Sequence, residues 1–442
     1  MRLKLFTFKG GQHPHDCKEI TQNKRIKDIP PSKIMVYPMS QHIGAPCEPI
    51  VKVGDYVSMG QKIGESKAFV SAPIHSTVSG KVVAIEKRPH PNGTNVLSVV
   101  IENDFEDKLL ETINDNYNDE CKLSPKEKIE IIKECGIVGL GGATFPTHIK
   151  LSPPPDKQID CCIINGAECE PYLTSDYRVM IETPIVIFEG LKQIMNILGV
   201  NKGYIGIENN KPEAIDIMKK VASNYDGVEI CVLKTKYPQG SEKHLIKAIT
   251  GREVPSGKLP ADVGVVVNNI DTCTAIYNAI KTRQPIFTRI ITVSGLAVKE
   301  PGNYRVRIGT GFDDILNHAQ FDAENTVKVL MGGPMMGISQ STLNVPTIKG
   351  TSAILALTYD ECHLDKEVSC ARCGKCVENC PMGLMPVQLN AYSKINDLET
   401  LKKYDVLDCI ECGVCSFTCP CGNHITQRIK LAKRQIAASK KK

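Results

Sequence analysis

The chain has 442 residues, of which 42% are hydrophobic and 23% are charged, and its formal net charge is +5. This length suffices for about three or four domains, and a charge so near zero gives no reason to expect nucleic acid as a partner. No apolar run reaches the ~18–20 residues of a membrane-spanning helix, and Met1–Gly11 does not resemble a secretory signal. The 19 cysteines therefore indicate a reducing compartment, where disulfides are rare.

Residues 1–105 are predicted to form an N-terminal domain of the barrel-sandwich class. Residues 34–101 alternate short apolar runs with turn residues, as small β-sandwiches and barrels do. The string Val51–Ile63, followed by Lys67, resembles biotinyl and lipoyl domains, in which a lysine at a hairpin tip carries the cofactor. The loop before Lys67 is about two residues shorter than in that family, so we expect no lipoate. Upstream, His13-Pro14-His15 is interpreted as a surface turn.

Residues 102–123 are acidic and rich in asparagine, which predicts a linker. Residues 124–283 follow as a second domain, in which strand and helix patterns alternate. Repeated strand–helix units predict a mostly parallel, Rossmann-like doubly wound α/β sheet. We expect strands at 159–165, 203–208, 228–234 and 263–268, and helices at 123–135, 184–198, 211–222, 241–250 and 272–281.

Four polar or glycine-rich loops of this domain lie next to predicted strands or helix starts. Gly139–Ala143 can approach a phosphate or a flat ring closely, because glycine has no Cβ. Asn165–Glu168 and Asn268-Asn269 each follow a strand, and Gly240–Glu242 precedes a helix N-terminus, where backbone N–H groups favour anions. One such turn would be only a tight turn, but four of them predict a nucleotide site.

The loops resemble the flavin site of the NADH-binding flavoprotein subunit of respiratory complex I. The matching strings are Gly139-x-Gly141-Gly142-Ala143-x-Phe145-Pro146-Thr147-x-x-Lys150, Asn165-x-x-Glu168-x-Glu170-Pro171, Tyr237-x-x-Gly240-x-Glu242 and Asn268-Asn269-x-Asp271-Thr272. Four positions depart from the family's pattern, and they are Leu140, Thr144, His148 and Ala167.

The resemblance implies a role for each matching residue. The FMN phosphate and ring edge would be held by Gly141, Gly142 and Lys150. The flavin would be hydrogen-bonded by Asn165, Asn268, Asn269 and Thr272. The nicotinamide side would be lined by Phe145 and Glu168, and the nucleotide would be met by Glu242. The same cofactor-binding loops include Gly139, Glu170, Tyr237 and Gly240.

Residues 284–358 are rich in β patterns, with expected strands at 290–295 and 302–306 and a helix at 312–318. They resemble the soluble-ligand-binding β-grasp (SLBB) domain that follows the flavin domain in the same families. We expect a packing role rather than a ligand for this domain. The turn Gly332–Gly337 either lines a path to the clusters described next or only packs.

Residues 359–442 carry two copies of one cysteine motif. The copies read Cys370-x-x-Cys373-x-x-Cys376-x-x-x-Cys380-Pro381 and Cys409-x-x-Cys412-x-x-Cys415-x-x-x-Cys419-Pro420. This run is typical of a ferredoxin-like domain with two [4Fe–4S] clusters, in which the fourth cysteine of each copy binds the other cluster. A zinc site would leave the third cysteine and the proline unexplained. We interpret the neighbouring Cys421 as a bystander.

The two clusters are therefore predicted to have crossed ligand sets. One set is Cys370, Cys373, Cys376 and Cys419, and the other is Cys409, Cys412, Cys415 and Cys380. Two short helices are expected within 386–404. After the motifs, apolar residues from Ile425 to Ile436 share one helical face with basic residues nearby. Such a tail lies on an anionic membrane, docks on a partner subunit, or is a solvated terminal helix.

Over nearly all of its residues the chain resembles the C subunits of Rnf complexes, which couple ferredoxin:NAD⁺ electron transfer to Na⁺ or H⁺ translocation. The resemblance implies a peripheral subunit at the cytoplasmic face of the membrane, with FMN, NAD(H) and two [4Fe–4S] clusters. Its partners would be the other Rnf subunits, including membrane subunits and an iron–sulfur subunit that accepts electrons from ferredoxin. Hydride transfer requires no catalytic acid or base from the protein.

Two alternatives stay open at this point. Relatives of this subunit pass electrons from NADH to soluble reductases of the proline-reductase type. The chain could also be a wiring module that carries clusters but no flavin, and the four departures from the flavin pattern favour that alternative.

Overall fold

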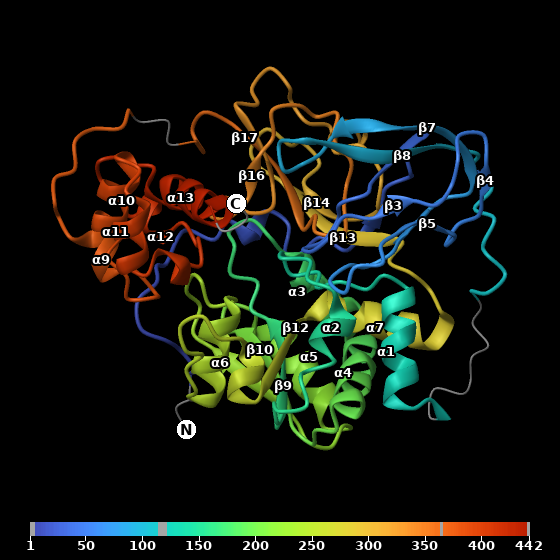
Figure 1. Ribbon diagram of the computed structural model, residues 1–442, viewed down its shortest axis with the longest axis horizontal. Helices are drawn as coiled ribbons and strands as arrows, with labels where there is room; N and C mark the ends of the chain where they lie inside the picture. The colour runs from blue at the N-terminus through green and yellow to red at the C-terminus, as the bar shows by residue number, and fades with distance from the viewer. Residues whose placement is uncertain (1–4, 114–121, 363–365, 440–442) are drawn as a thin grey trace.

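The computed structural model describes residues 5–113, 122–362 and 366–439. Four packed units follow one another along these residues (Figure 1). An α/β unit lies at the bottom of this view, two β units lie above it, and the C-terminal helical unit lies to one side. None of the helices in the described ranges combines the length and the apolar character that crossing a bilayer requires.

The first β unit consists of two facing sheets around one apolar core. Met35, Tyr37 and Val57 are among its fully buried side chains. The larger sheet has the order β2-β8-β7-β4 and the smaller one the order β3-β5-β6. The strands are β2 (Ile34–Pro38), β3 (Glu48–Pro49), β4 (Tyr56–Val57), β5 (Lys62–Glu65), β6 (Ile74–His75), β7 (Gly80–Pro89) and β8 (Asn95–Asn103).

The predicted linker is partly fixed to this unit. The Met59 amide donates to the Lys108 carbonyl, and the Leu110 amide donates to the Met59 carbonyl. Residues 114–121 of the predicted linker lie outside the described residues.

The α/β unit is built on four parallel strands in the order β11-β10-β9-β12. Helices cover both faces: α4 and α7 belong to the larger apolar core, and α6 packs on the opposite face. Its elements are α1 (Pro125–Glu134), α2 (Thr147–Lys150), β9 (Cys161–Gly166), α3 (Ser175–Glu182), α4 (Pro184–Leu198), β10 (Gly203–Glu208), α5 (Pro212–Ala222), β11 (Val228–Leu233), α6 (Glu242–Thr250), η3 (Pro260–Val263), β12 (Val265–Asn269) and α7 (Ile270–Thr282).

Local signals explain where these elements begin and end. Ser124 and Glu127 form a reciprocal capping box at the start of α1. Gly199 ends α4 in the left-handed conformation, at φ 67°, which glycine adopts without strain. The strands and helices predicted for this unit are confirmed to within two residues at either end.

The second β unit has a six-stranded sheet in the order β1-β14-β13-β17-β15-β16, and its edge strand β1 (Lys27–Asp28) comes from the N-terminal part of the chain. Helix α8 packs on one face through Phe312, Ile315 and Leu316, which are fully buried. The predicted helix at 312–318 is confirmed. The elements are β13 (Thr288–Ser294), β14 (Gly302–Arg307), α8 (Phe312–His318), β15 (Lys328–Met331), β16 (Ile338–Ser339) and β17 (Ala353–Leu357).

The C-terminal unit is a small helical domain. Its elements are α9 (Lys375–Glu378), α10 (Pro386–Lys394), α11 (Leu398–Lys403), η4 (Val406–Asp408), α12 (Val414–Phe417) and α13 (Ile425–Ser439). The apolar face of α13 points inward, because Ile425, Ile429 and Ile436 pack with Leu389 and Leu401. The apolar face is therefore covered by its own domain and is not the surface on which the tail would meet a membrane or a partner, whereas docking through the basic side chains of the tail stays a prediction.

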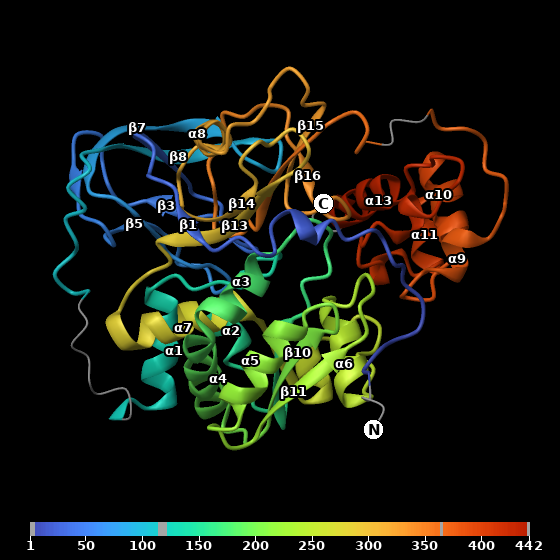
Figure 2. The same cartoon turned by 180° about the vertical axis from the view of Figure 1, so that it is seen from behind.

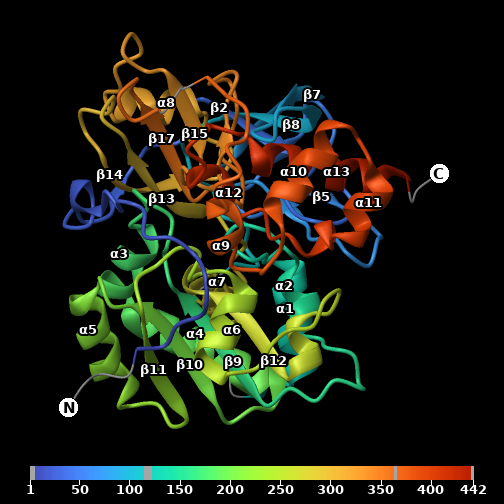
Figure 3. The ribbon, with the colours of Figure 1, turned by 90° about the vertical axis from the view of Figure 1, so that its left-hand side faces the viewer.

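The N-terminal segment 5–28 does not pack in the barrel that follows it. It runs past the α/β unit and the helical unit towards the second β unit (Figures 2 and 3). Phe6 bridges to Leu233 at the end of β11, and the Gly11 amide donates to the Asn379 carbonyl at 3.0 Å. Strand β1 (Lys27–Asp28) then pairs with β14. We call residues 5–28 the N-terminal strap, because they connect three units distant in sequence.

Candidate functional site

The four predicted loops meet at the carboxyl edge of the parallel sheet. The Asn165 side-chain amide donates to the Gly240 carbonyl at 2.8 Å, which joins the second loop to the third. The Leu140 amide donates to the Thr272 hydroxyl at 2.9 Å, which joins the first to the fourth. At Gly141, an added Cβ would lie only 3.0 Å from the side chain of Asn269. Glycine there permits the close approach of the two loops.

Lys150 and Glu242 lie in this site and are paired with one another. The Lys150 ammonium donates to Glu242 Oε1 at 2.9 Å and to the Val267 carbonyl at 2.8 Å. Both side chains keep contact with solvent, with exposed fractions of 29% and 39%. A half-exposed pair of this kind is worth little by itself, so either charge can turn to a bound nucleotide at small cost.

Asn268 provides a test of whether a ligand fits here. The residue is 4% exposed, and its side-chain amide Nδ2 has no hydrogen-bond partner among the residues that the structure describes. A buried donor without an acceptor costs about 1–3 kcal/mol. A flat heterocycle with carbonyl and ring-nitrogen acceptors, such as a flavin, would satisfy it. The open glycine loop at Gly141-Gly142, both exposed, leaves room beside it.

Carboxylates gather on the inner side of the site. Glu168 accepts from the Asp176 amide at 2.8 Å at the start of α3. The Asp176 carboxylate accepts from the Asn269 amide at 2.7 Å. Burial, with the nearby charges of Glu168 and Asp271, raises the pKa of Asp176 to about 7. A carboxyl group with a pKa near 7, placed beside a predicted flavin contact, can gain or lose a proton when a ligand binds.

Arg289 belongs to the neighbouring β unit and contacts the inner side of the site. It forms an ion pair with Asp271 and donates to the Leu140 carbonyl at 2.9 Å. Sequence motifs indicated neither Arg289 nor Asp176. The start of α3 at Thr174-Ser175 could have suggested a helix cap near Asp176, whereas Arg289 belongs to another domain and gave no signal. The partly buried Phe145 accepts from the Gly139 amide at 2.9 Å through its carbonyl.

Glu170 and Tyr237 turn from the flavin loops towards the cysteine motifs. The Tyr237 hydroxyl donates to the Cys412 carbonyl at 2.8 Å and lies 3.4 Å from Glu170 Oε1. The Glu170 carboxylate accepts from the amides of Met335 and Met336 at 3.1 and 2.9 Å. Burial raises the pKa of Glu170 to about 7.

The turn Gly332–Gly337 therefore lies between the flavin loops and the second cysteine motif. At Gly333, an added Cβ would lie 2.2 Å from Glu170 Oε2, so the contact requires glycine. On the other side of the interface, His244 of α6 lies 3.0 Å from the Pro381 carbonyl through Nε2. The helical unit thus contacts both α6, through His244, and the β11–α6 connection, through Tyr237.

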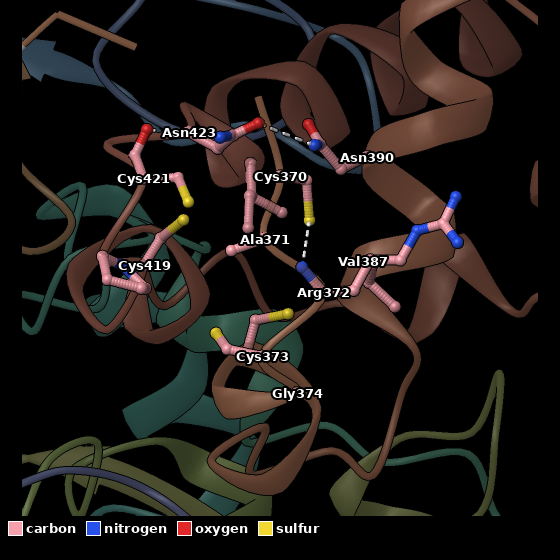
Figure 4. A pocket seen from close by; sticks show the side chains of 13 residues that line it. Cys370, Ala371, Arg372, Cys373, Gly374, Val387, Asn390, Cys419, Cys421 and Asn423 are labelled. Atoms are coloured by element: carbon pink, nitrogen blue, oxygen red, sulfur yellow. Dashed lines mark hydrogen bonds between the residues drawn. The ribbon is translucent and has the colours of Figure 1, made fainter. Parts of the chain in front are cut away.

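The cysteines of the two motifs lie in two groups. One cavity is lined by Cys370, Cys373, Cys376 and Cys419, and Cys421 also lines it. In Figure 4 the sulfur atoms of the labelled cysteines surround a common space. The interpretation of Cys421 as a bystander therefore misses its place in the cavity wall.

The second set is more deeply placed. Burial raises the pKa of the Cys412 thiol to about 12, with smaller effects from Cys409, Cys415 and Cys380, which are its neighbours. The exposed fractions of Cys412 and Cys415 are both 8%, whereas Cys370 and Cys373 are exposed. One set is therefore open to solvent and the other is next to Tyr237.

Comparison with known families divides the chain in the same way. Residues 6–106 match the RnfC barrel sandwich hybrid domain. Residues 132–278 match the Nuo51 FMN-binding domain. Residues 290–339 match the SLBB domain, and residues 369–423 match the 4Fe-4S dicluster domain.

Whole-chain relatives cover nearly the entire length. The C subunit of the proton-translocating ferredoxin:NAD(+) oxidoreductase complex of Clostridium ljungdahlii is 49% identical, over 98% of this chain and 95% of its own. The C subunit of the Na(+)-translocating complex of Acetobacterium woodii is 46% identical over 100% of both chains. The C subunit of the ion-translocating oxidoreductase complex of Rhodobacter capsulatus is 42% identical, over 92% of this chain and 78% of its own.

One solved structure is similar in fold alone. It is the NAD⁺-reducing [NiFe]-hydrogenase in the H2-reduced state, with a TM-score of 0.50 and 18% identity. The match covers 71% of this chain and 61% of the hydrogenase chain.

Proposed function

The chain belongs to the family of C subunits of ion-translocating ferredoxin:NAD⁺ oxidoreductase (Rnf) complexes, and from this premise we propose that it is the NAD(H)-binding electron-transfer subunit of such a complex. It combines an FMN-binding domain with a 4Fe-4S dicluster domain. The hydrogen bond from Tyr237 to the Cys412 carbonyl carries the proposal, because it joins a flavin loop directly to a cysteine motif. A redox protein needs such a short connection between its cofactors.

The flavin would lie on the carboxyl edge of the sheet, held by the loops that meet there. When bound, FMN supplies the exchange between a hydride and single electrons. Asn268 would donate its unpaired amide to the ring, and Gly141 and Gly142 would let the backbone approach it. Lys150 would turn from Glu242 to the phosphate, which leaves Glu242 free to meet NAD(H).

The remaining predicted residues would shape the site. Asn165, Asn269 and Thr272 hold the loops in register and would also bond the flavin. Phe145 and Glu168 would line the nicotinamide side. The turn Gly332–Gly337, fixed by Glu170, would exclude water between flavin and cluster.

Two [4Fe–4S] clusters would be bound by the crossed ligand sets. The cavity formed by Cys370, Cys373, Cys376 and Cys419 supports one set, and the proximity of Cys380 to Cys412 supports the other. The buried cluster would exchange electrons with the flavin, because its ligands lie beside Tyr237. The cluster at the exposed cysteines would exchange electrons with another subunit.

We place the chain at the cytoplasmic face of the membrane as a peripheral subunit. Its relatives are named as subunits of translocating complexes, so we propose membrane subunits and a ferredoxin-accepting iron–sulfur subunit as partners. One relative's name specifies protons and another's specifies Na⁺, which leaves both ions open for this complex. Of the four domain bounds proposed from the sequence, 124–283, 284–358 and 359–442 are kept, and the barrel domain proposed as 1–105 would begin after the N-terminal strap.

The test is an anaerobic reduction of the isolated chain after reconstitution with iron, sulfide and FMN. NADH should bleach the flavin absorbance and then reduce clusters, which is followed by EPR. Without flavin or NADH binding, the chain would be a cluster module only, and the proposal would fail.

Two variants test the order of the clusters. In Cys412→Ala, NADH should still bleach the flavin but leave the exposed cluster oxidised. In Cys373→Ala, the buried cluster should still be reduced. The reverse pattern would show that the flavin is connected to the exposed cluster.

A further inference from the structure

Three potential metal ligands converge at a place unrelated to the flavin and the clusters. They are His15, Cys17 and Glu19 of the N-terminal strap, whose ligand atoms all lie within 4.8 Å of one another. His15 Nδ1 is 3.1 Å from Cys17 Sγ. Among residues 5–113, 122–362 and 366–439, no other three His, Cys, Asp or Glu residues meet this condition.

The backbone of the strap is shaped so that these side chains converge. Cys17 has φ 49° and ψ 25°, in the left-handed region that residues with a side chain rarely adopt. Such a conformation costs on the order of 1 kcal/mol and persists where the surroundings impose it. It precedes the short η1 turn (Lys18–Ile20), which brings Glu19 back towards His15.

Neighbouring groups hold this turn in place. The buried Lys18 side chain points away from the three ligands and donates to the carbonyls of Glu170, at 2.9 Å, and Leu173, at 2.5 Å. The Asp16 carbonyl accepts from the Tyr172 amide at 2.7 Å. His15 and Glu19 are exposed and Cys17 is partly exposed, so the three ligands are accessible from solvent on a turn that Lys18 and Asp16 anchor.

The local charge favours a cation at this place. Glu19, Asp16 and Glu361 lie close enough to the Cys17 thiol to act on it electrostatically. Lys18 is the adjacent basic residue, and its ammonium is occupied by the two carbonyls. A divalent ion would neutralise this negative surrounding and stabilise the thiolate.

We propose that His15, Cys17 and Glu19 bind one divalent ion of the zinc class, with water in the fourth position. Sulfur, nitrogen and oxygen ligands together suit a borderline ion such as Zn²⁺, and its tetrahedral edges between sulfur and nitrogen are roughly 3.5 Å. The observed separations of 3.1 Å and up to 4.8 Å require only small side-chain movements to reach that geometry. His13 is exposed and does not belong to this group of three.

The bound ion would take no part in electron transfer and would affect the flavin site only by fixing the loop beside it. The strap holds the β9–α3 connection, since Lys18 takes two of its carbonyls and Thr21 is hydrogen-bonded to Thr174 at 2.7 Å. This connection carries Glu168 and Glu170. Metal binding at the strap would therefore stiffen the loop on which both predicted contacts lie.

The test uses the full chain with reconstituted clusters and FMN. After treatment with a chelator that leaves the cluster iron in place, Zn²⁺ alone is titrated against a chromophoric competitor. The wild type should bind one further zinc ion per chain, and X-ray absorption at the zinc edge should show one sulfur ligand. Cys17→Ser and His15→Ala should each weaken binding about thirtyfold or more, which corresponds to about 2 kcal/mol.

His13→Ala is the matched control and should change zinc affinity less than about twofold, an effect below 0.5 kcal/mol. Iron content and the cluster EPR signals should be equal in all four proteins, which shows that they are folded and that zinc has not displaced iron. As a second readout, zinc should slow amide hydrogen exchange across residues 12–22 in the wild type but not in Cys17→Ser. Zinc binding that is equal in wild type and Cys17→Ser, or absent from the wild type, would overturn the proposal.

Discussion

Lys150 and Glu242 form an ion pair at the place where the family motifs assign one to a phosphate and the other to a nucleotide. The pair keeps two opposite charges in the site, and both remain accessible to solvent. Motifs predict which residues meet, but they do not predict that two of them pair with each other. The contact depends on how the end of α2 and the start of α6 are placed relative to one another in the folded chain.

Lys150→Met should weaken FMN binding about tenfold or more. The substitution keeps the aliphatic stem and removes the charge-assisted hydrogen bond to phosphate, which is worth about 1.5–3 kcal/mol. The measurement is quenching of FMN fluorescence on titration with the chain. Lys157→Met is the control, because Lys157 also forms ion pairs, with Asp156 and Asp262, but lies before β9 at the amino edge of the sheet. Equal affinities of wild type and Lys150→Met would exclude the phosphate role.

Cys421 lies in the cavity wall beside the exposed cysteine set. It lines the cavity of Cys370, Cys373, Cys376 and Cys419, whereas the corresponding position after the first motif is Met382. We expect Cys419→Ala to keep a [4Fe–4S] cluster, because Cys421 can replace the lost thiolate. Cys380→Ala should lose the buried cluster, since Met382 offers no thiolate.

The prediction is tested by measuring the iron content and the EPR spectra of the variants. Cys419→Ala should retain nearly full iron, and the double variant with Cys421→Ala should lose about half of it, the share of one of two clusters. Loss of half the iron in Cys419→Ala alone would show that Cys421 does not reach the cluster. The motif spacing predicts the eight cysteines directly. That Cys421 lies near them depends on the conformation of the turn after Pro420, which the spacing does not predict.

At the scale of elements, local patterns predict most of the helices and strands but not what their faces touch. The period of Ile425, Ile429, Ala432 and Ile436 predicts helix α13 and its apolar side. The same pattern cannot distinguish a face that covers a domain from one that lies on a membrane. Here α10 and α11 supply the partner surface, and both lie earlier in the chain.

Ile429→Asp should therefore destabilise the C-terminal unit and release its iron. Ile429 is 1% exposed, and a carboxylate buried in its place costs several kcal/mol. Leu431→Asp is the control on the same helix, since Leu431 is 57% exposed. Thermal unfolding and iron content measure both. If Ile429→Asp behaved like Leu431→Asp, the apolar face would not be internal in solution.

At the scale of the whole molecule, the contacts that assemble the site lie between segments far apart in the sequence. The N-terminal strap connects the α/β unit, the helical unit and the second β unit. Glu170 of the α/β unit meets Met335 of the second β unit and, through Tyr237, the Cys412 carbonyl. Periodicity and motifs act over short distances along the chain, so they predict the four domains but none of these joints.

Glu170 should make this three-way joint depend on pH. Burial raises its folded-state pKa from the ordinary 4.5 to about 7, so the folded chain favours the protonated form. Its stabilising contribution is present in full below about pH 4.5 and is lost as pH rises through about 7. The loss amounts to about 3 kcal/mol, since each pKa unit is worth about 1.4 kcal/mol.

In Glu170→Gln this pH-dependent term should disappear. The wild-type unfolding temperature should fall between pH 5 and pH 8 by more than that of the variant, and the two should approach each other at the acidic end. Glu253→Gln, at an exposed carboxylate paired with Lys247, should follow the wild type. Parallel curves for wild type and Glu170→Gln would mean that Glu170 is solvated. In that case the hydrogen bonds of Glu170 would not hold its loop, the turn Gly332–Gly337 and the C-terminal unit together in solution.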